Sequence, residues 1–213
     1  ECQQLNNVVK WLISKQYHFI VCGAFQDGLI GLAEFTKAGI SMDKQHAMQL
    51  MCRNYSDYNL EFHSAHYTNR ELISMLLPSI NYTGKEPTYY KSSYVPFIKY
   101  NPEDISVVIK RGKLISGILD KSTAGQETMG SIFHVIANQH GNKKAFDCIF
   151  SIQQLTQEFF LYHGFTTGLK DILVNDKAME QIKQKSAEMI LKAEEITTNL
   201  NLGTLIPPIG VSL

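Results

Sequence analysis

The chain of 213 residues is long enough for one large domain or two small ones, and its 44% hydrophobic content is ample for a core. Twenty basic and twenty acidic side chains give a formal net charge of zero. A free-standing nucleic-acid-binding protein usually carries a basic excess, because contacts with phosphates supply much of its affinity. Any nucleic-acid contact of this chain must therefore be local, or be shared with other chains.

The four cysteines stand far apart in the sequence, and none forms a C-x-x-C pair: Cys2, Cys22, Cys52 and Cys148. This spacing argues against a disulfide framework or a zinc site, and it fits a reducing intracellular compartment. No apolar run approaches the roughly 18 residues that a membrane-spanning helix needs, and no signal peptide is evident. The chain opens on Glu1 rather than Met, so we expect it to be cut from something longer.

The first forty residues combine apolar runs with glycines. The stretch HFIVCGAF (18–25) predicts a strand, QDG (26–28) predicts a turn, and the residues that follow predict a short helix ended by Gly39. Ser41 is the expected N-cap of a second helix, whose residues are MDKQHAMQLMCRN (42–54).

A capping box and a hairpin are the clearest local signals. Thr68 and Glu71 have the T-x-x-E spacing of a capping box, so a helix should begin there and end before Pro78. Residues 79–104 hold three prolines among several tyrosines and predict irregular or edge structure. The β-branched stretch 105–120 is broken by Arg111-Gly112 and predicts a β-hairpin.

Helical periodicity returns in the C-terminal half, within 131–141, 143–164 and 176–200. In the last of these segments the apolar residues form one narrow stripe, which predicts a helix buried along that stripe. The order of helices, then strands, then helices favours an α+β fold, with helices flanking a small antiparallel hairpin or sheet, over a repeated βαβ unit.

Residues 125–131 read G-x-x-x-x-G-S, which is one lysine short of a phosphate-binding P-loop. A P-loop needs that lysine to reach the outer phosphates, and here Ser131 follows Gly130 directly. The simpler interpretation is a tight loop whose glycines permit positive φ angles. A nucleotide-hydrolysing enzyme is therefore a minor alternative.

Other polar groups have a structural interpretation beside a functional one. His63 and His66 have a spacing that two metal ligands can share, but no carboxylate or thiol joins them at motif spacing. His134 lies within an apolar run, where a hydrogen-bonded core histidine is the usual case. Glu103 and Asp104 follow a proline and favour a turn or a cap over a general acid–base pair. We find no self-sufficient catalytic set of residues.

Five segments follow one another along the chain: AFQDGLIGLAEFTKAG, YTNRELISMLLPSIN, VVIKRGKLISGILDKSTAG, MGSIFHVIANQHG and IFSIQQLTQEFFLYHGFTTGLKDIL. In this order they resemble motifs of the largest subunit of multi-subunit DNA-dependent RNA polymerases, and the resemblance is nearest to asfarvirus-like large DNA viruses. The resemblance runs from about Val21 to Gly210. It implies a nucleotidyltransferase that copies DNA into RNA, found in the host cytoplasm or the virion if viral and otherwise in the nucleus.

The resemblance also implies a domain plan. Residues 1–26 would end the active-site domain, 27–170 would form the pore domain, and 171–213 would start the helical funnel. In that family these parts line the secondary channel, through which nucleoside triphosphates enter and backtracked RNA 3′ ends leave. Implied partners are other polymerase subunits, the DNA template, RNA, nucleoside triphosphates and a transcript-cleavage factor. No contact with a membrane is expected.

Site residues follow from the resemblance as expectations. Lys121 keeps one of two lysines that the family often has after the hairpin, and Arg70 matches a lysine of the second motif, so both are candidates for phosphate contacts in the channel. Weaker candidates surround the hairpin turn: Lys110, Arg111 and Lys113. Gln26 and Asp27 are expected to brace the junction with the active-site domain.

The family's catalytic motif N-A-D-F-D-G-D does not occur in this chain. The chain alone should therefore bind no metal and be inactive, while the parent enzyme should hold catalytic Mg²⁺ and structural Zn²⁺ elsewhere. The main alternative is a free-standing interaction or regulatory protein derived from a polymerase segment.

Overall fold

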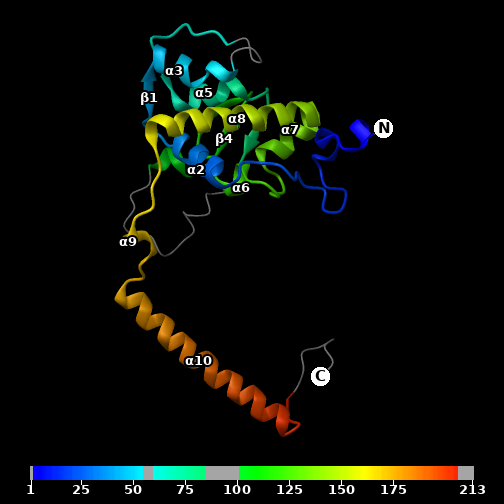
Figure 1. Ribbon diagram of the computed structural model, residues 1–213, viewed down its shortest axis with the longest axis vertical. Helices are drawn as coiled ribbons and strands as arrows, with labels where there is room; N and C mark the ends of the chain where they lie inside the picture. Colours follow the sequence, from blue (N-terminus) through cyan, green and yellow to red (C-terminus); the bar gives the residue numbers. More distant parts are fainter. Residues whose placement is uncertain (1, 55–59, 85–100, 206–213) are drawn as a thin grey trace. The chain divides into compact units, whose positions relative to one another are not determined.

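A computed structural model describes residues 2–54, 60–84 and 101–205 of the chain (Figure 1). The chain divides into two compact units, one up to Gly164 and one from Phe165 onward. The first unit contains helices and two small antiparallel sheets, which confirms the α+β class. The pore and funnel boundary expected at 170/171 is a functional division, and it stays a prediction.

The first unit begins with α1 (Cys2–Leu5) and a 3₁₀ turn, η1 (Val8–Trp11). The predicted strand over 18–25 is not a regular strand: Ile20 and Ala24 make isolated bridges only, to Ile13 and Gly125. The predicted turn at 26–28 is instead the first turn of α2 (Gln26–Phe35), because Phe25 already has the extended backbone of an N-cap residue.

The second helix begins later than expected. Ser41 belongs to β1 (Ser41–Asp43), and α3 (Lys44–Leu50) is capped by the Asp43 carboxylate, which accepts a hydrogen bond from the His46 backbone N–H. Ser41 pairs with Thr68 across a two-stranded sheet, and this tertiary pairing overrides its capping propensity. A second 3₁₀ turn, η2 (Cys52–Asn54), follows.

The capping box is confirmed at the start of α5 (Asn69–Leu76), where the Thr68 and Glu71 side chains each bond the other's backbone N–H. The helix follows β2 (His66–Thr68) and ends before Pro78. The tyrosine-rich part of 79–104 lies mostly outside the described residues. Its described ends hold β3 (Tyr82–Thr83) and η4 (Pro102–Asp104).

The predicted hairpin is confirmed: β4 (Val108–Lys110) and β5 (Lys113–Ser116) pair antiparallel, and β3 adds a third strand beside β4. Arg111 and Gly112 form the turn with positive φ angles of 50° and 77°. Positive φ at both turn positions is the geometry of a two-residue type I′ hairpin, which follows the natural twist of the strands.

Three helices complete the first unit: α6 (Lys121–Ala124), α7 (Ile132–His140) and α8 (Asn142–His163). The long α8 is the central element of the core, and it contacts α2, α5 and α7 (Figure 1). Its Phe159 ring meets the fully buried Phe35 ring of α2 edge to face, with 5.0 Å between ring centroids.

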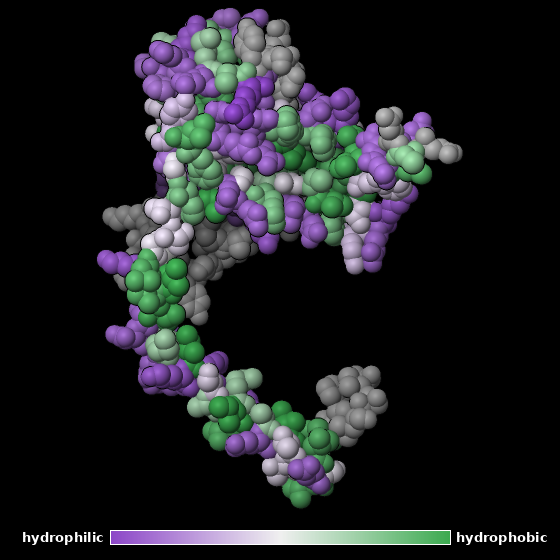
Figure 2. Space-filling model, viewed as in Figure 1, coloured by the Kyte–Doolittle hydropathy of each residue, from purple (hydrophilic) through white to green (hydrophobic). Residues whose placement is uncertain are grey.

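The second unit consists of α9 (Leu169–Ile172) and α10 (Asp176–Asn201). The expected helix over 176–200 is present, but the expected burial of its stripe is not. None of its residues is buried within the described chain, and apolar side chains along it lie open in Figure 2. A single long helix has no second apolar face of its own against which to bury such a stripe.

Candidate functional site

The DKSTAG loop (120–125) is a one-turn helix with a complete cap. The Asp120 carboxylate accepts hydrogen bonds from the Ser122 backbone N–H at 2.9 Å and from the Ser122 hydroxyl at 2.6 Å. The Thr123 hydroxyl accepts from the Asp120 N–H at 3.0 Å and closes the capping box. These bonds stabilise the turn that carries Lys121 at its first position.

Lys121 itself is exposed. Its backbone carbonyl accepts hydrogen bonds from the Gly125 N–H and the Thr128 hydroxyl, so its main chain is held by later residues of the loop. In the part of the chain that the structure describes, no ion pair is recorded for its ammonium group. Lys121 is therefore a cation on a fixed backbone, open to an anion from outside.

The geometry of the loop excludes a P-loop. Gly125 has a φ of −69°, and its absence of a side chain is explained by crowding: a Cβ would lie 2.5 Å from the Lys121 carbonyl oxygen. Only Gly130, with a φ of 74°, has the positive value expected of a loop glycine. Ser131 caps α7 through the His134 backbone N–H and is fully buried, so it offers no hydroxyl to a metal.

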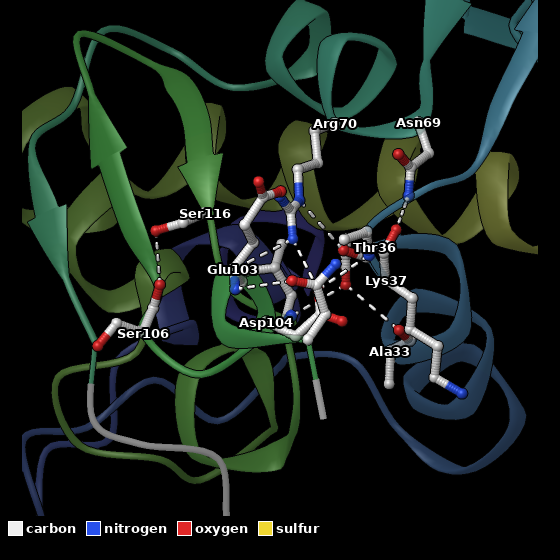
Figure 3. Close-up of polar contacts among 12 residues, drawn as sticks. Ala33, Thr36, Lys37, Asn69, Arg70, Glu103, Asp104, Ser106 and Ser116 are labelled. Carbon is white, nitrogen blue, oxygen red and sulfur yellow. Dashed lines mark hydrogen bonds and ion pairs between the residues drawn. The ribbon is translucent and has the colours of Figure 1, made fainter. Parts of the chain in front are cut away.

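The Arg70 side chain lies among protein acceptors, and its channel role stays a prediction (Figure 3). We call this group the Arg70 cluster, and it consists of Thr36, Asn69, Arg70, Glu103 and Asp104. The Arg70 side chain is 11% exposed, and its guanidinium donates to the Asp104 carboxylate at 2.7 Å. Further bonds reach the Glu103 carboxylate at 3.4 Å and the Thr36 carbonyl at 3.4 Å. Its donors are directed at protein acceptors, so in this structure Arg70 joins α5 to η4 and to the end of α2.

Two residues of the Arg70 cluster, Thr36 and Asn69, have structural roles that were not predicted from the sequence. The Thr36 hydroxyl donates to the Leu32 carbonyl and accepts from the Leu119 N–H at 3.0 Å. The buried Asn69 amide donates to the Phe35 and Lys37 carbonyls. Adjacent polar residues at the ends of predicted helices are a weak signal for such contacts, because they fit exposed caps equally well.

The hairpin tip carries three exposed cations, Lys110, Arg111 and Lys113. Lys110 and Lys113 are direct cross-strand partners, an arrangement in which like charges repel. Asn81 accepts from the Arg111 N–H at 3.0 Å, and the Gly112 N–H donates to Ile80, so the turn is anchored to the chain before β3. The tip is a fixed basic surface.

The tip and Lys121 do not form one cluster. The turn precedes β5, whereas Lys121 follows residues 117–120, beyond the far end of that strand. Because each strand residue advances the chain by about 3.3 Å, the two basic sites lie at opposite ends of the hairpin.

Gln26 and Asp27 lie in the first turn of α2 and are exposed. Together with Gln153, Gln157 and Phe160 of α8 they line an open groove. The position is compatible with a contact to another part of a larger protein, and the bracing role stays a prediction.

The remaining candidates have ordinary partners. His63 lies 3.0 Å from the Glu61 carboxylate on an exposed segment, and His66 stands in β2. His134 is half-buried, and its Nδ1 accepts from the Gly130 N–H at 3.2 Å. Within the described ranges, no three His, Cys, Asp or Glu side chains are grouped so that they could hold a metal ion. Nor is any helix described there long and apolar enough to cross a membrane.

Comparison with known proteins places this arrangement in a family. Residues 11–172 match the family model described as RNA polymerase Rpb1, domain 3. The chain belongs to the RPB1 family, the largest subunits of DNA-directed RNA polymerases. The match covers the first unit from Trp11 onward and extends through α9.

Two groups of RPB1 relatives illustrate the range of the similarity. The DNA-directed RNA polymerase RPB1 homolog of African swine fever virus (isolate Tick/Malawi/Lil 20-1/1983) is 34% identical over 228 residues, covering 100% of this chain and 15% of the relative. The RNA polymerase II subunit RPB1-B of Trypanosoma brucei brucei is 30% identical over 148 residues, covering 69% of this chain and 8% of the relative. The chain thus spans a small part of the length of these subunits, and it is a segment of an RNA polymerase largest subunit similar to that of asfarviruses.

Proposed function

We propose that this segment walls the secondary channel of the polymerase, with residues 27–170 as the pore domain and 171–213 as the start of the funnel. Residues 1–26 would complete the active-site domain. The proposal rests on the order of the polymerase-like motifs and on one structural observation: Lys121 is an exposed cation on a loop whose backbone is held by several hydrogen bonds. A fixed positive charge suits the transient binding of phosphates that must also leave.

Lys121 is the principal phosphate-contacting residue in this proposal. Ser122 cannot substitute for a second lysine, because its hydroxyl is bonded to Asp120. The tip cations Lys110, Arg111 and Lys113 lie at the other end of the hairpin, so they would meet a different part of an RNA or triphosphate. Arg70 would act indirectly by holding η4 and α5 together.

The proposed partners follow from membership of a polymerase. They are other polymerase subunits, the DNA template, RNA, nucleoside triphosphates and a transcript-cleavage factor. The described residues offer no metal-binding cluster, so Mg²⁺ and Zn²⁺ would be held by other parts of the enzyme. The compartment would be the host cytoplasm or the virion for a viral enzyme, and the nucleus otherwise. All four cysteines are free, which suits a reducing environment.

Replacement of Lys121 in the assembled polymerase tests the proposal. Lys121→Ala should slow cleavage of backtracked RNA by about two- to fivefold, the effect of losing an exposed charge contact of roughly 0.4–1 kcal/mol, and should leave ordinary elongation nearly unchanged. Lys143→Ala is the matched control, because Lys143 is also an exposed lysine near a helix start and its side chain is 83% exposed. Equal cleavage rates for the wild type and Lys121→Ala would refute the channel role of Lys121.

A further inference from the structure

The loop that carries Lys121 is bonded to a segment almost a hundred positions earlier in the chain. The Ala24 N–H donates to the Ala124 carbonyl at 2.9 Å, and the Ala24 carbonyl accepts from the Gln126 N–H at 3.3 Å. A third bond joins the Glu127 N–H to the Ile20 carbonyl at 3.1 Å. The first two bonds form an isolated parallel bridge between Ala24 and Gly125, and the third holds Glu127 to the same N-terminal segment.

The contact depends on Gly23, and the fold of the loop itself depends on Gly125. A Cβ on Gly23 would lie 2.6 Å from the Gln126 nitrogen and 2.7 Å from the Gly125 carbonyl carbon, both backbone atoms. A Cβ on Gly125 would lie 2.5 Å from the Lys121 carbonyl oxygen. Backbone atoms cannot rotate away as a side-chain end can, so a methyl group at Gly23 must push the two segments apart.

The backbone is also unusual where the two segments leave the contact. Gln26 and Glu127 are not glycine, yet their φ angles are 44° and 54°. Such residues are uncommon at positive φ and persist where the surrounding structure fixes them. Here the surrounding structure is the bridge itself on one side and helix α2 on the other. The position of the loop is therefore set by tertiary contact as well as by its own cap.

We propose that Gly23 is a positioning residue for Lys121. Its missing side chain lets the segment 20–26 lie flush against residues 125–127, and this contact sets where the Lys121 ammonium is presented. This inference rests on the proposed channel function, since positioning affects activity only if Lys121 contacts phosphate. It adds that a displacement of the segment 20–26 is transmitted to the channel loop through three backbone hydrogen bonds.

The first measurement is functional and uses the assembled polymerase. Gly23→Ala should slow cleavage of backtracked RNA as much as Lys121→Ala does, while elongation stays near the wild-type rate. The double variant Gly23→Ala/Lys121→Ala should be no slower than Lys121→Ala, because both changes remove the same contact. Gly28→Ala is the control, since a Cβ there would lie 3.9 Å from the Gln153 side chain, at ordinary contact distance. If the two single effects multiply in the double variant, or if Gly23→Ala slows elongation and cleavage equally, the positioning role is refuted.

A second measurement separates this inference from the channel function itself. In the assembled enzyme, hydrogen exchange of the Gln126 and Glu127 amides should be at least about tenfold faster in Gly23→Ala than in the wild type, because both bonds cross the contact. Unchanged exchange would refute the positioning inference whatever the cleavage rates are. Faster exchange together with an unaffected Lys121→Ala enzyme would instead refute the channel role and retain the structural coupling.

Discussion

The Arg70 guanidinium lies 2.7 Å from the Asp104 carboxylate, and the two side chains are only 11% and 12% exposed. Asp104 also accepts a hydrogen bond from the Ala38 N–H at 2.8 Å, so a single carboxylate joins α5, η4 and the chain after α2. Because this charge pair is largely removed from water, loss of Arg70 leaves the Asp104 carboxylate without its cation, and loss of Asp104 leaves Arg70 with only the longer 3.4 Å ion pair to Glu103 among the described residues.

Removal of one partner of this pair should therefore be costly. Arg70→Ala or Asp104→Ala should lower the free energy of unfolding of the 213-residue chain by about 3 kcal/mol or more, as measured by urea denaturation. The double variant should lose less than the sum of the two single variants, because the pair acts as a unit. Lys37→Ala is the control, since it breaks the exposed Lys37–Glu34 pair and should cost less than about 1 kcal/mol. A loss of similar size in Arg70→Ala and Lys37→Ala would contradict a stabilising role for the buried pair.

The two residues of the hairpin turn should respond in opposite directions. Arg111 has a φ of 50°, which glycine adopts without a steric penalty, so Arg111→Gly should keep or raise thermal stability. Gly112→Ala should lower stability by about 1–3 kcal/mol, because its φ is 77° and its Cβ would lie 2.6 Å from the Pro78 carbonyl oxygen. Thermal unfolding followed by circular dichroism measures both. Similar melting temperatures for the two variants would show that the turn geometry is not what fixes the hairpin.

The buried thiol of Cys148 should be unreactive toward thiol-modifying reagents in the folded chain. Burial raises its pKa from 9.0 to about 12, and the reactive form of a thiol is the thiolate. At pH 8 a maleimide should label the exposed Cys2 and Cys52 quickly and Cys148 only after unfolding, as mass spectrometry of peptides can show. Rapid labelling of native Cys148 would mean that the α8 packing opens readily.

The same thiol gives a pH dependence with a definite sign. Because the folded pKa of Cys148 is the higher one, the unfolded chain loses this proton first as pH rises above about 9. Its contribution to stability is therefore complete below that pH and is lost progressively toward pH 12. The free energy of unfolding should fall less steeply over this range in Cys148→Ala than in the wild type. Parallel curves would exclude Cys148 as a source of the alkaline loss.

The cap of α3 distinguishes Asp43 from Ser41. Asp43→Ala should destabilise the chain while Ser41→Ala has little effect, because the Asp43 carboxylate, not the serine hydroxyl, accepts the His46 N–H. That backbone hydrogen bond lowers the pKa of Asp43 below its ordinary value, so the cap contributes at neutral pH and is lost as pH falls through the lowered pKa. Acid titrations of the two variants by circular dichroism test this. Greater destabilisation by Ser41→Ala than by Asp43→Ala would show that the serine, and not the aspartate, caps α3.

Local patterns in the sequence determined a large part of this protein. The T-x-x-E pair at Thr68 and Glu71 identified a helix start, Arg111-Gly112 identified the hairpin turn, and periodicity identified α7, α8 and α10. Each of these depends on neighbours within about four positions, where backbone geometry and hydrogen-bond reach are the same in any fold. The order of polymerase-like motifs likewise identified the family, which the comparisons confirmed.

Only the tertiary structure decided the partners of distant residues. Nothing near Arg70 in sequence indicates that its charge is paired with Asp104, and nothing near Gly23 indicates that it must admit the backbone of residues 125–127. Ser41 has the propensity of a cap but lies in a strand, because Thr68 pairs with it across β1 and β2. Such outcomes depend on which surfaces meet when the core forms, and a residue's neighbours along the chain do not specify that. The sequence alone therefore determined the elements and the family, and packing decided which charges remain available to a ligand.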